Sequence, residues 1–272
     1  MLKKNIIFLV ALFSVTTILG QTKEEVYEKY LKKGAYNHSI YHPKYQQYID
    51  SALAIRPNDA FLLQQKAMPL FKEKKYELGM QYMDKAVEND DKYDKYLSYR
   101  AFIKCIFQKN YKSAIQDFDL LISHYSTGII MDHTFYFYRG LSKLQLNQLD
   151  AAEKDIQSSI DFSKANKFDP HYFELFYLGI IYLEKENYTK AMEYFDQSLK
   201  YYPKYSDSQF YKATCLYFLN KKQEAYNLLL TSKINFDNGD TITEDNKFYE
   251  EYPYQLKNWM LDGWIESLKK QI

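Results

Sequence analysis

The side chains that most often do chemistry are few in this chain and do not form a known site. His38 and His42 lie four residues apart, a spacing that can hold a metal, but Pro43 follows directly and no third ligand is near. We interpret them as solvated histidines of a turn. The stretch from Asp237 to Asp245 is rich in carboxylates, but its spacing differs from that of an EF-hand, so an acidic loop is favoured. No metal site is expected.

Catalytic and nucleotide-binding patterns are also missing from the sequence. No two of the eight glycines are close enough for either common phosphate-binding fingerprint. No serine stands in a nucleophile-elbow context, and His124, His133 and His171 are expected in loops without a partner that spacing identifies. We therefore predict that the protein is not an enzyme and has no cofactor. The net charge is +1 and the 36 basic residues include only three arginines, which argues against nucleic acid as a ligand.

The N-terminal residues have the layout of a secretory signal peptide. Lys3 and Lys4 precede an apolar run over residues 6–19, which is shorter than the ~20 residues of a membrane-spanning helix. We predict a signal peptide over residues 1–20, cleaved near Gly20, and no integral membrane span in the mature chain. Because Gln21 stands where bacterial lipoproteins have a cysteine, a lipid anchor of that kind is excluded. The protein is expected to be exported, and to be periplasmic or associated with the cell surface.

The composition indicates a folded and mostly helical chain. Hydrophobic residues make up 46% and charged residues 26% of the 272 residues, which excludes a disordered chain. A mean hydropathy of -0.53 excludes a polytopic membrane protein. Eight glycines and six prolines supply too few turns for an all-β sandwich or barrel. The 29 tyrosines raise the aromatic content to 18%, more than a compact core needs, so some rings are expected to face a partner.

A repeat of about 34 residues runs along the chain. In its clearest unit, Tyr172 to Tyr205, two amphipathic helices are separated at Asn187, which is expected to cap the second of them. Gly179 and Ala191 would let the helices approach closely, and Phe195 would fill the space beyond them. The second-helix pattern recurs at Tyr45/Ile49/Ala52, Gly79/Met83/Ala86, Ala114/Phe118/Leu121, Ala152/Ile156/Ser159 and Ala225/Leu229/Ser232. Six units begin near Val26, Ala60, Asp94, His133, Tyr172 and Ser206, with long loops at 126–132 and 164–171.

Between residues 26 and 237 this pattern resembles the tetratricopeptide repeat family. The resemblance implies an all-α, right-handed solenoid of about six antiparallel helix pairs, whose first helices line a concave groove that binds peptides or partner segments. We assign residues 22–237 to the solenoid and 238–272 to an acidic loop and a C-terminal amphipathic capping helix. The apolar face of that helix is expected to comprise Leu256, Trp259, Met260, Gly263, Trp264 and Leu268.

The repeat register predicts which side chains line the groove. The predicted partner-binding residues are Phe137, Leu141, Phe176, Ile180, Phe210 and Tyr217. Gln64 and Ser98 occupy the corresponding position of the second and third repeats, which predicts that the N-terminal half of the groove is polar. Chaperone-binding members of the family hold a C-terminal carboxylate with Lys and Asn, and Phe176 and Ile180 replace them here, which argues against that ligand. The structural alternative is that the phenylalanines pack against neighbouring helices.

These observations favour a non-catalytic exported scaffold or adaptor that holds a peptide segment or partner protein in an aromatic concave groove. The alternative is a small-molecule or glycan binder of the cell envelope, because tyrosine rings also suit sugars. An enzyme would need a further domain, and residues 238–272 are too short to supply one. Cys105 and Cys215 lie three repeats apart, so they are expected to be buried and not bonded to each other.

Overall fold

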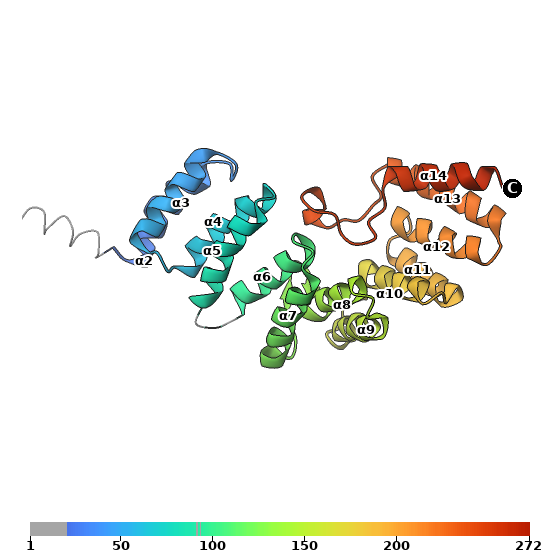
Figure 1. The fold of residues 1–272 in the computed structure, drawn as a ribbon, viewed down its shortest axis with the longest axis horizontal. Coiled ribbons are helices and arrows are strands. Elements are labelled where there is room, and N and C mark those ends of the chain that lie inside the picture. Colours follow the sequence, from blue (N-terminus) through green and yellow to red (C-terminus); the bar gives the residue numbers. More distant parts are fainter. Residues whose placement is uncertain (1–20, 91, 93) are drawn as a thin grey trace, which may run out of the picture. The chain divides into compact units, whose positions relative to one another are not determined.

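The computed structural model describes residues 21–90, 92 and 94–272, so the predicted signal peptide lies outside the described residues. The chain divides into two compact units, residues 1–100 and 101–272, with the boundary inside helix α6. Within each unit, consecutive helices pack as antiparallel pairs (Figure 1). We call the helices of a pair its first and second helix, in chain order. The expected helical solenoid is confirmed.

Unit 1 contains two helix pairs and the start of a third first helix. Its elements are α2 (Lys23–Val26), the π-helical turn η1 (Tyr27–Lys32), the 3-10 turn η2 (Ala35–Asn37), α3 (Pro43–Ile55), α4 (Ala60–Lys72), α5 (Tyr76–Glu88) and α6 (Lys95–Ile106). A core around Val26, Leu31 and Ile49 joins the first pair to α4. His42 caps α3, and its Nδ1 accepts a hydrogen bond of 3.1 Å from the Lys44 amide. No group of three metal-ligating side chains occurs among the described residues.

Unit 2 continues the pairs and ends in a single helix. Its elements are α7 (Tyr111–Tyr125), β1 (Ile129–Ile130), β2 (His133–Thr134), α8 (Phe135–Gln145), α9 (Leu149–Ala165), α10 (Tyr172–Glu184), α11 (Tyr188–Tyr201), α12 (Ser206–Phe218), α13 (Lys222–Asp237), the 3-10 turn η3 (Asp245–Phe248) and α14 (Asn258–Lys269). The expected loop at 126–132 was only partly right, because β1 pairs antiparallel with β2. Strands of two residues leave no periodic signal in a sequence.

The predicted repeat register is confirmed by burial. Every side chain of the second-helix pattern is buried, and so are the small residues of the first helices. At Gly179, a Cβ atom would lie 2.5 Å from Cε1 of Phe195, so this contact between α10 and α11 admits only glycine. Asn187 caps α11 as expected, accepting a hydrogen bond of 3.2 Å from the Lys190 amide.

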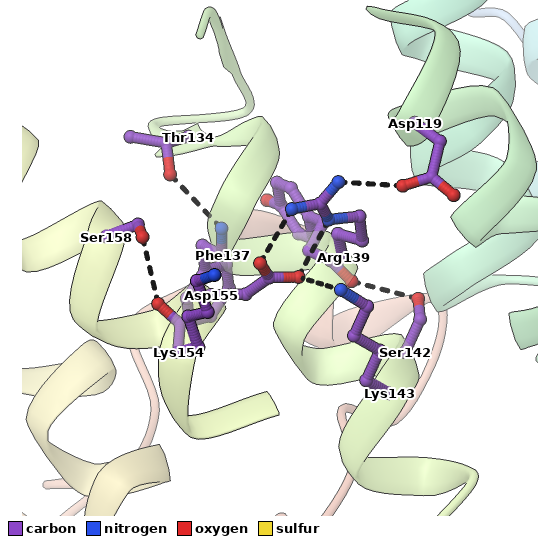
Figure 2. Close-up of polar contacts among 10 residues, drawn as sticks. Asp119, Thr134, Phe137, Arg139, Ser142, Lys143, Lys154, Asp155 and Ser158 are labelled. Atoms are coloured by element: carbon purple, nitrogen blue, oxygen red, sulfur yellow. Dashed lines mark hydrogen bonds and ion pairs between the residues drawn. The ribbon is translucent and has the colours of Figure 1, made fainter. Parts of the chain in front are cut away.

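An ion pair recurs at four of the junctions between a second helix and the first helix of the next repeat. The pairs and their N to O distances are Asp50 to Lys66 (2.6 Å), Asp84 to Arg100 (2.9 Å), Asp119 to Arg139 (2.7 Å) and Asp196 to Lys212 (2.5 Å). Figure 2 shows Arg139 between Asp119 of α7 and Asp155 of α9. The junction from α9 to α10 differs, because Gln157 and Leu178 occupy the corresponding positions. This junction therefore lacks the ion pair.

The C-terminal helix α14 packs against α13, as a capping helix should. Its buried side chains are Leu261 and Leu268, and Trp264 contacts Phe210 edge-on with ring centroids 6.2 Å apart. The expected apolar face is wrong at Trp259, which is 69% exposed, and at Gly263, which is also exposed, and Leu256 precedes the helix. Among the described residues, no helix combines the length and the apolar character needed to cross a membrane.

Candidate polypeptide-binding faces

In unit 2, the surface of the first helices is covered by the chain's own C-terminal segment. We call residues 240–257 the strap, and the surface formed by first helices the inner face of a unit. The Tyr177 hydroxyl donates to the Pro253 carbonyl at 2.8 Å, and Asp207 Oδ1 accepts from the Leu256 amide at 2.8 Å. The Tyr172 hydroxyl accepts from the Thr243 amide at 3.1 Å. Side chains of the inner face therefore bind main-chain atoms of the strap.

Three apolar side chains of the strap complete its attachment. Ile242, Tyr252 and Leu256 are 1%, 2% and 4% exposed. The ring of Tyr252 contacts that of Phe173 edge-on, with centroids 5.7 Å apart. The strap is thus held as a peptide ligand is held, by polar contacts to its backbone and by burial of spaced side chains.

A buried polar cluster lies under the start of the strap. His133 Nε2 lies 3.0 Å from Glu244 Oε1, and the two side chains are 1% and 10% exposed. The pKa of His171 is lowered to about 4, first by burial and then by nearby His133. Burial raises the pKa of Glu174, although the Ser159 hydroxyl, which donates to it at 2.5 Å, opposes the shift. Through Glu244, this cluster joins the strap to β2 and to the start of α10.

Asp207 is the most deeply buried carboxyl that contacts the strap. It is fully buried on α12, and burial raises its pKa to about 6. The hydrogen bonds from the Leu256 amide and the Ser206 hydroxyl oppose that rise without cancelling it. Its main role in the structure is to accept the backbone N–H at the end of the strap.

The six predicted partner-binding residues lie mostly in the core. Phe137, Leu141, Phe176, Ile180 and Phe210 are at most 2% exposed, and Tyr217 is half-buried. Phe137 packs on Phe173 and Tyr177, while Phe176 packs on Phe195 and Tyr211. Phe210 and Tyr217 contact Trp264 of α14. The phenylalanines therefore pack against neighbouring helices, which was the alternative interpretation. None of the six residues is an open docking position in this structure.

The side chains that do contact the strap were not predicted. They include Lys109, His133, Tyr172, Phe173, Tyr177, Glu184, Tyr202, Asp207 and Tyr211. The excess of tyrosine indicated such a surface, but the repeat register placed it at Phe176, next to Tyr177 on α10. Neighbouring residues of a helix point about 100° apart. An error of one residue in the repeat register therefore assigns the contact surface to Phe176 when Tyr177 makes the contact.

The inner face of unit 1 holds an open aromatic cleft. Its volume is about 400 Å³, and its lining residues are Lys23, Tyr27, Leu31, Lys32, Tyr36, Phe61, Lys95 and Tyr96. The rings of Tyr27 and Phe61 have centroids 5.4 Å apart. Lys95 Nζ lies 5.2 Å from the centroid of Phe61 and 5.3 Å from that of Tyr96. The cleft therefore combines exposed ring surface with positive charge.

Asp59 stands beside this cleft, and its carboxylate oxygens already have partners. The Tyr27 hydroxyl donates to Asp59 at 2.7 Å, which together with burial raises the pKa of Tyr27. Asp59 also caps α4 and pairs with Arg56. The expectation of a polar N-terminal half was wrong: Gln64 and Ser98 are buried, and rings from the preceding turn of each helix occupy the surface.

Comparisons with known proteins agree with this architecture. The family model of the tetratricopeptide repeat matches residues 172–205. A tetratricopeptide repeat protein from Parabacteroides merdae is 12% identical, with a TM-score of 0.62 over 90% of this chain and 99% of that one. Pseudomonas aeruginosa pilF is 16% identical, with a TM-score of 0.60 over 83% and 97%. YrrB, described as a TPR protein with an unusual peptide-binding site, is 16% identical, with a TM-score of 0.51 over 70% and 93%.

No curated protein matches the sequence. The solved structures share the fold with this chain, and the family is generally one of non-catalytic proteins that bind other proteins. One tetratricopeptide repeat is thus recognised in the sequence, at residues 172–205, and the helix pairs of the chain have the fold of solved tetratricopeptide repeat proteins.

Proposed function

We propose that the protein is a non-catalytic scaffold that binds an extended segment of a partner protein on the inner face of unit 1. The observation that carries this proposal is the strap. In unit 2 the same kind of surface, built from first helices, holds residues 240–257 through hydrogen bonds to main-chain atoms. An inner face of this chain is therefore able to bind polypeptide, and among the described residues of unit 1 (21–90, 92 and 94–100) no segment fills its cleft.

The cleft also indicates what kind of segment it suits. Lys23 Nζ lies 5.4 Å from the ring centroid of Tyr27, and neither Lys23 nor Lys95 has a carboxylate partner among the described residues. A carboxylate side chain of the partner would supply that charge, and a neighbouring apolar side chain would cover the rings of Tyr27 and Phe61. We therefore expect the bound segment to be acidic and to carry an aromatic or aliphatic anchor.

Export is part of the proposal. Residues 1–20 have the lysine pair and short apolar run of a cleaved signal peptide. The mass of the purified native protein tests this directly, because cleavage near Gly20 leaves a chain that begins at Gln21. A native protein that retains residues 6–19 would contradict export by this route.

Site-specific crosslinking tests the binding site. A photoreactive phenylalanine analogue at Tyr96 should crosslink one discrete partner in the native cell, whereas the same analogue at exposed Leu78 of α5 should not. Adding Tyr27→Ala and Lys95→Gln should remove the crosslink at position 96, because these changes delete an anchor ring and a cation of the cleft. Equal crosslinking from positions 78 and 96 would show that the cleft is not the site.

A further inference from the structure

The second helices α9 and α11 of unit 2 enclose a cleft on the side of the repeats that the strap does not touch. We call it the outer cleft. Its volume is about 660 Å³, within the usual range for small-molecule sites. Gln157 lines it, at the junction where the recurring aspartate and its basic partner are replaced by Gln157 and Leu178. The outer cleft therefore opens where the regular contact between repeats is missing.

Positive charge dominates the lining of the outer cleft. Lys164, Lys167 and Lys200 line it, and none of the three forms an ion pair among the described residues. Other lysines of unit 2 do form ion pairs, as Lys143 does with Asp155 and Lys212 does with Asp196. The lining contains one aspartate, so three positive charges face one negative charge.

Aromatic and amide side chains make up the rest of the accessible lining. Phe168 is 68% exposed and Tyr201 is 40% exposed, and the half-buried Tyr194 also lines the cleft. Gln197 of α11 is exposed, and Gln157 of α9 is half-buried. Ring faces stack on the apolar faces of sugar rings, while amides and ammonium groups bind hydroxyls and carboxylates.

We propose that the outer cleft binds an anionic oligosaccharide. The strap shows how this protein holds polypeptide, with buried apolar side chains and groups aimed at main-chain atoms. The outer cleft instead offers exposed ring faces, amides and unpaired ammonium groups in a hollow of small-molecule size. A ligand rich in hydroxyls and carboxylates matches that lining better than an acidic peptide does. This site shares no lining residue with the cleft of unit 1, so it stands independently of the proposed partner binding.

Calorimetric titration of the full mature chain tests the proposal. The anionic probes are tetragalacturonate, tetramannuronate and a chondroitin sulfate tetrasaccharide, with cellotetraose as a neutral probe and tetraglutamate as an acidic peptide. At least one anionic sugar should bind at least about tenfold more tightly than cellotetraose and tetraglutamate, and added salt should weaken it. Failure of all three anionic sugars to bind would overturn the proposal, and so would equal affinity for tetraglutamate.

Variants locate the site. Tyr201→Ala and Phe168→Ala, both at exposed positions, should each weaken the sugar at least about fivefold, and Lys164→Gln with Lys200→Gln about tenfold or more. Lys154→Gln, on α9 but outside the lining, is the matched control and should bind like wild type. Circular dichroism checks that each variant is folded. Unchanged affinity in the folded Tyr201 and lysine variants would overturn the assignment of the site.

Discussion

The hydroxyl of Tyr177 on α10 donates a hydrogen bond of 2.8 Å to the backbone carbonyl of Pro253, 76 residues later in the chain. This contact fixes the middle of the strap on the inner face of unit 2. Since Tyr177 is fully buried, its hydroxyl would lose its partner if the strap left without a replacement. The inner face of unit 2 is therefore built to hold polypeptide, and the chain itself supplies it.

Replacing Gly179 with leucine should lower the free energy of unfolding by at least ~1–3 kcal/mol, because its Cβ would already overlap the ring of Phe195. Chemical denaturation measures the change. Gly263→Leu is the matched control, since nothing lies within 4 Å of a Cβ built there. An unfolding midpoint equal to that of wild type for the Gly179 variant would mean that the α10 and α11 contact is wrong.

The Asp155 carboxylate should contribute more than an exposed ion pair does. It bridges Arg139 and Lys143 at 2.7 Å from each, and its side chain is 4% exposed (Figure 2). Asp155→Ala should cost ~1.5–3 kcal/mol, because Lys143 loses its carboxylate partner and Arg139 keeps only Asp119, whose side chain is exposed. The Asp150 side chain, which pairs with Lys185, is 98% exposed. Asp150→Ala should therefore lower the free energy of unfolding by under ~0.5 kcal/mol. Similar losses from both variants in urea denaturation would contradict this difference.

Asp207 should make the stability depend on pH. Its pKa of about 6 in the folded chain lies above the ~3.9 of an unfolded chain, so the folded state binds the proton more tightly. Its contribution is therefore most favourable below about pH 4 and declines as the pH rises through about 6. Asp207→Asn keeps an acceptor for the Leu256 amide and removes the titration.

The stability of the Asp207→Asn variant relative to wild type should thus increase between about pH 4 and pH 7.5 in urea denaturation. Other titrating groups, including His171, are common to both proteins and cancel in the comparison. A difference between the two proteins that stays constant with pH would show that the buried carboxyl does not titrate in this range.

Both thiols should be inert in the folded protein. Cys105 and Cys215 are free and buried, as expected from the sequence, and burial raises the pKa of each to about 12. Alkylation followed by mass spectrometry should therefore show no modification until the chain is unfolded. Rapid labelling of either cysteine under native conditions would show that the surrounding helices open.

The helix pairs could be predicted because their packing is local and periodic. Gly179 and Phe195 are 16 residues apart, and so are Gly140 and Ile156, which make the corresponding contact between α8 and α9. The strap has no such period. Its position depends on contacts such as that of Tyr252 with Phe173, which join distant segments once only. The sequence therefore predicted only a loop for the strap. It also predicted Phe176 as the contact residue of α10, whereas Tyr177 contacts the strap.

The strap occupies the inner face of unit 2 through hydrogen bonds from its own backbone. Hydrogen exchange of the full mature chain measures this, because the Thr243 and Leu256 amides donate to side chains of the inner face. These amides should exchange at least about a hundredfold more slowly than in an unstructured peptide, and Tyr177→Phe should speed their exchange. Exchange of residues 242–256 at the rate of a free peptide, while α10 and α12 stay protected, would contradict the account.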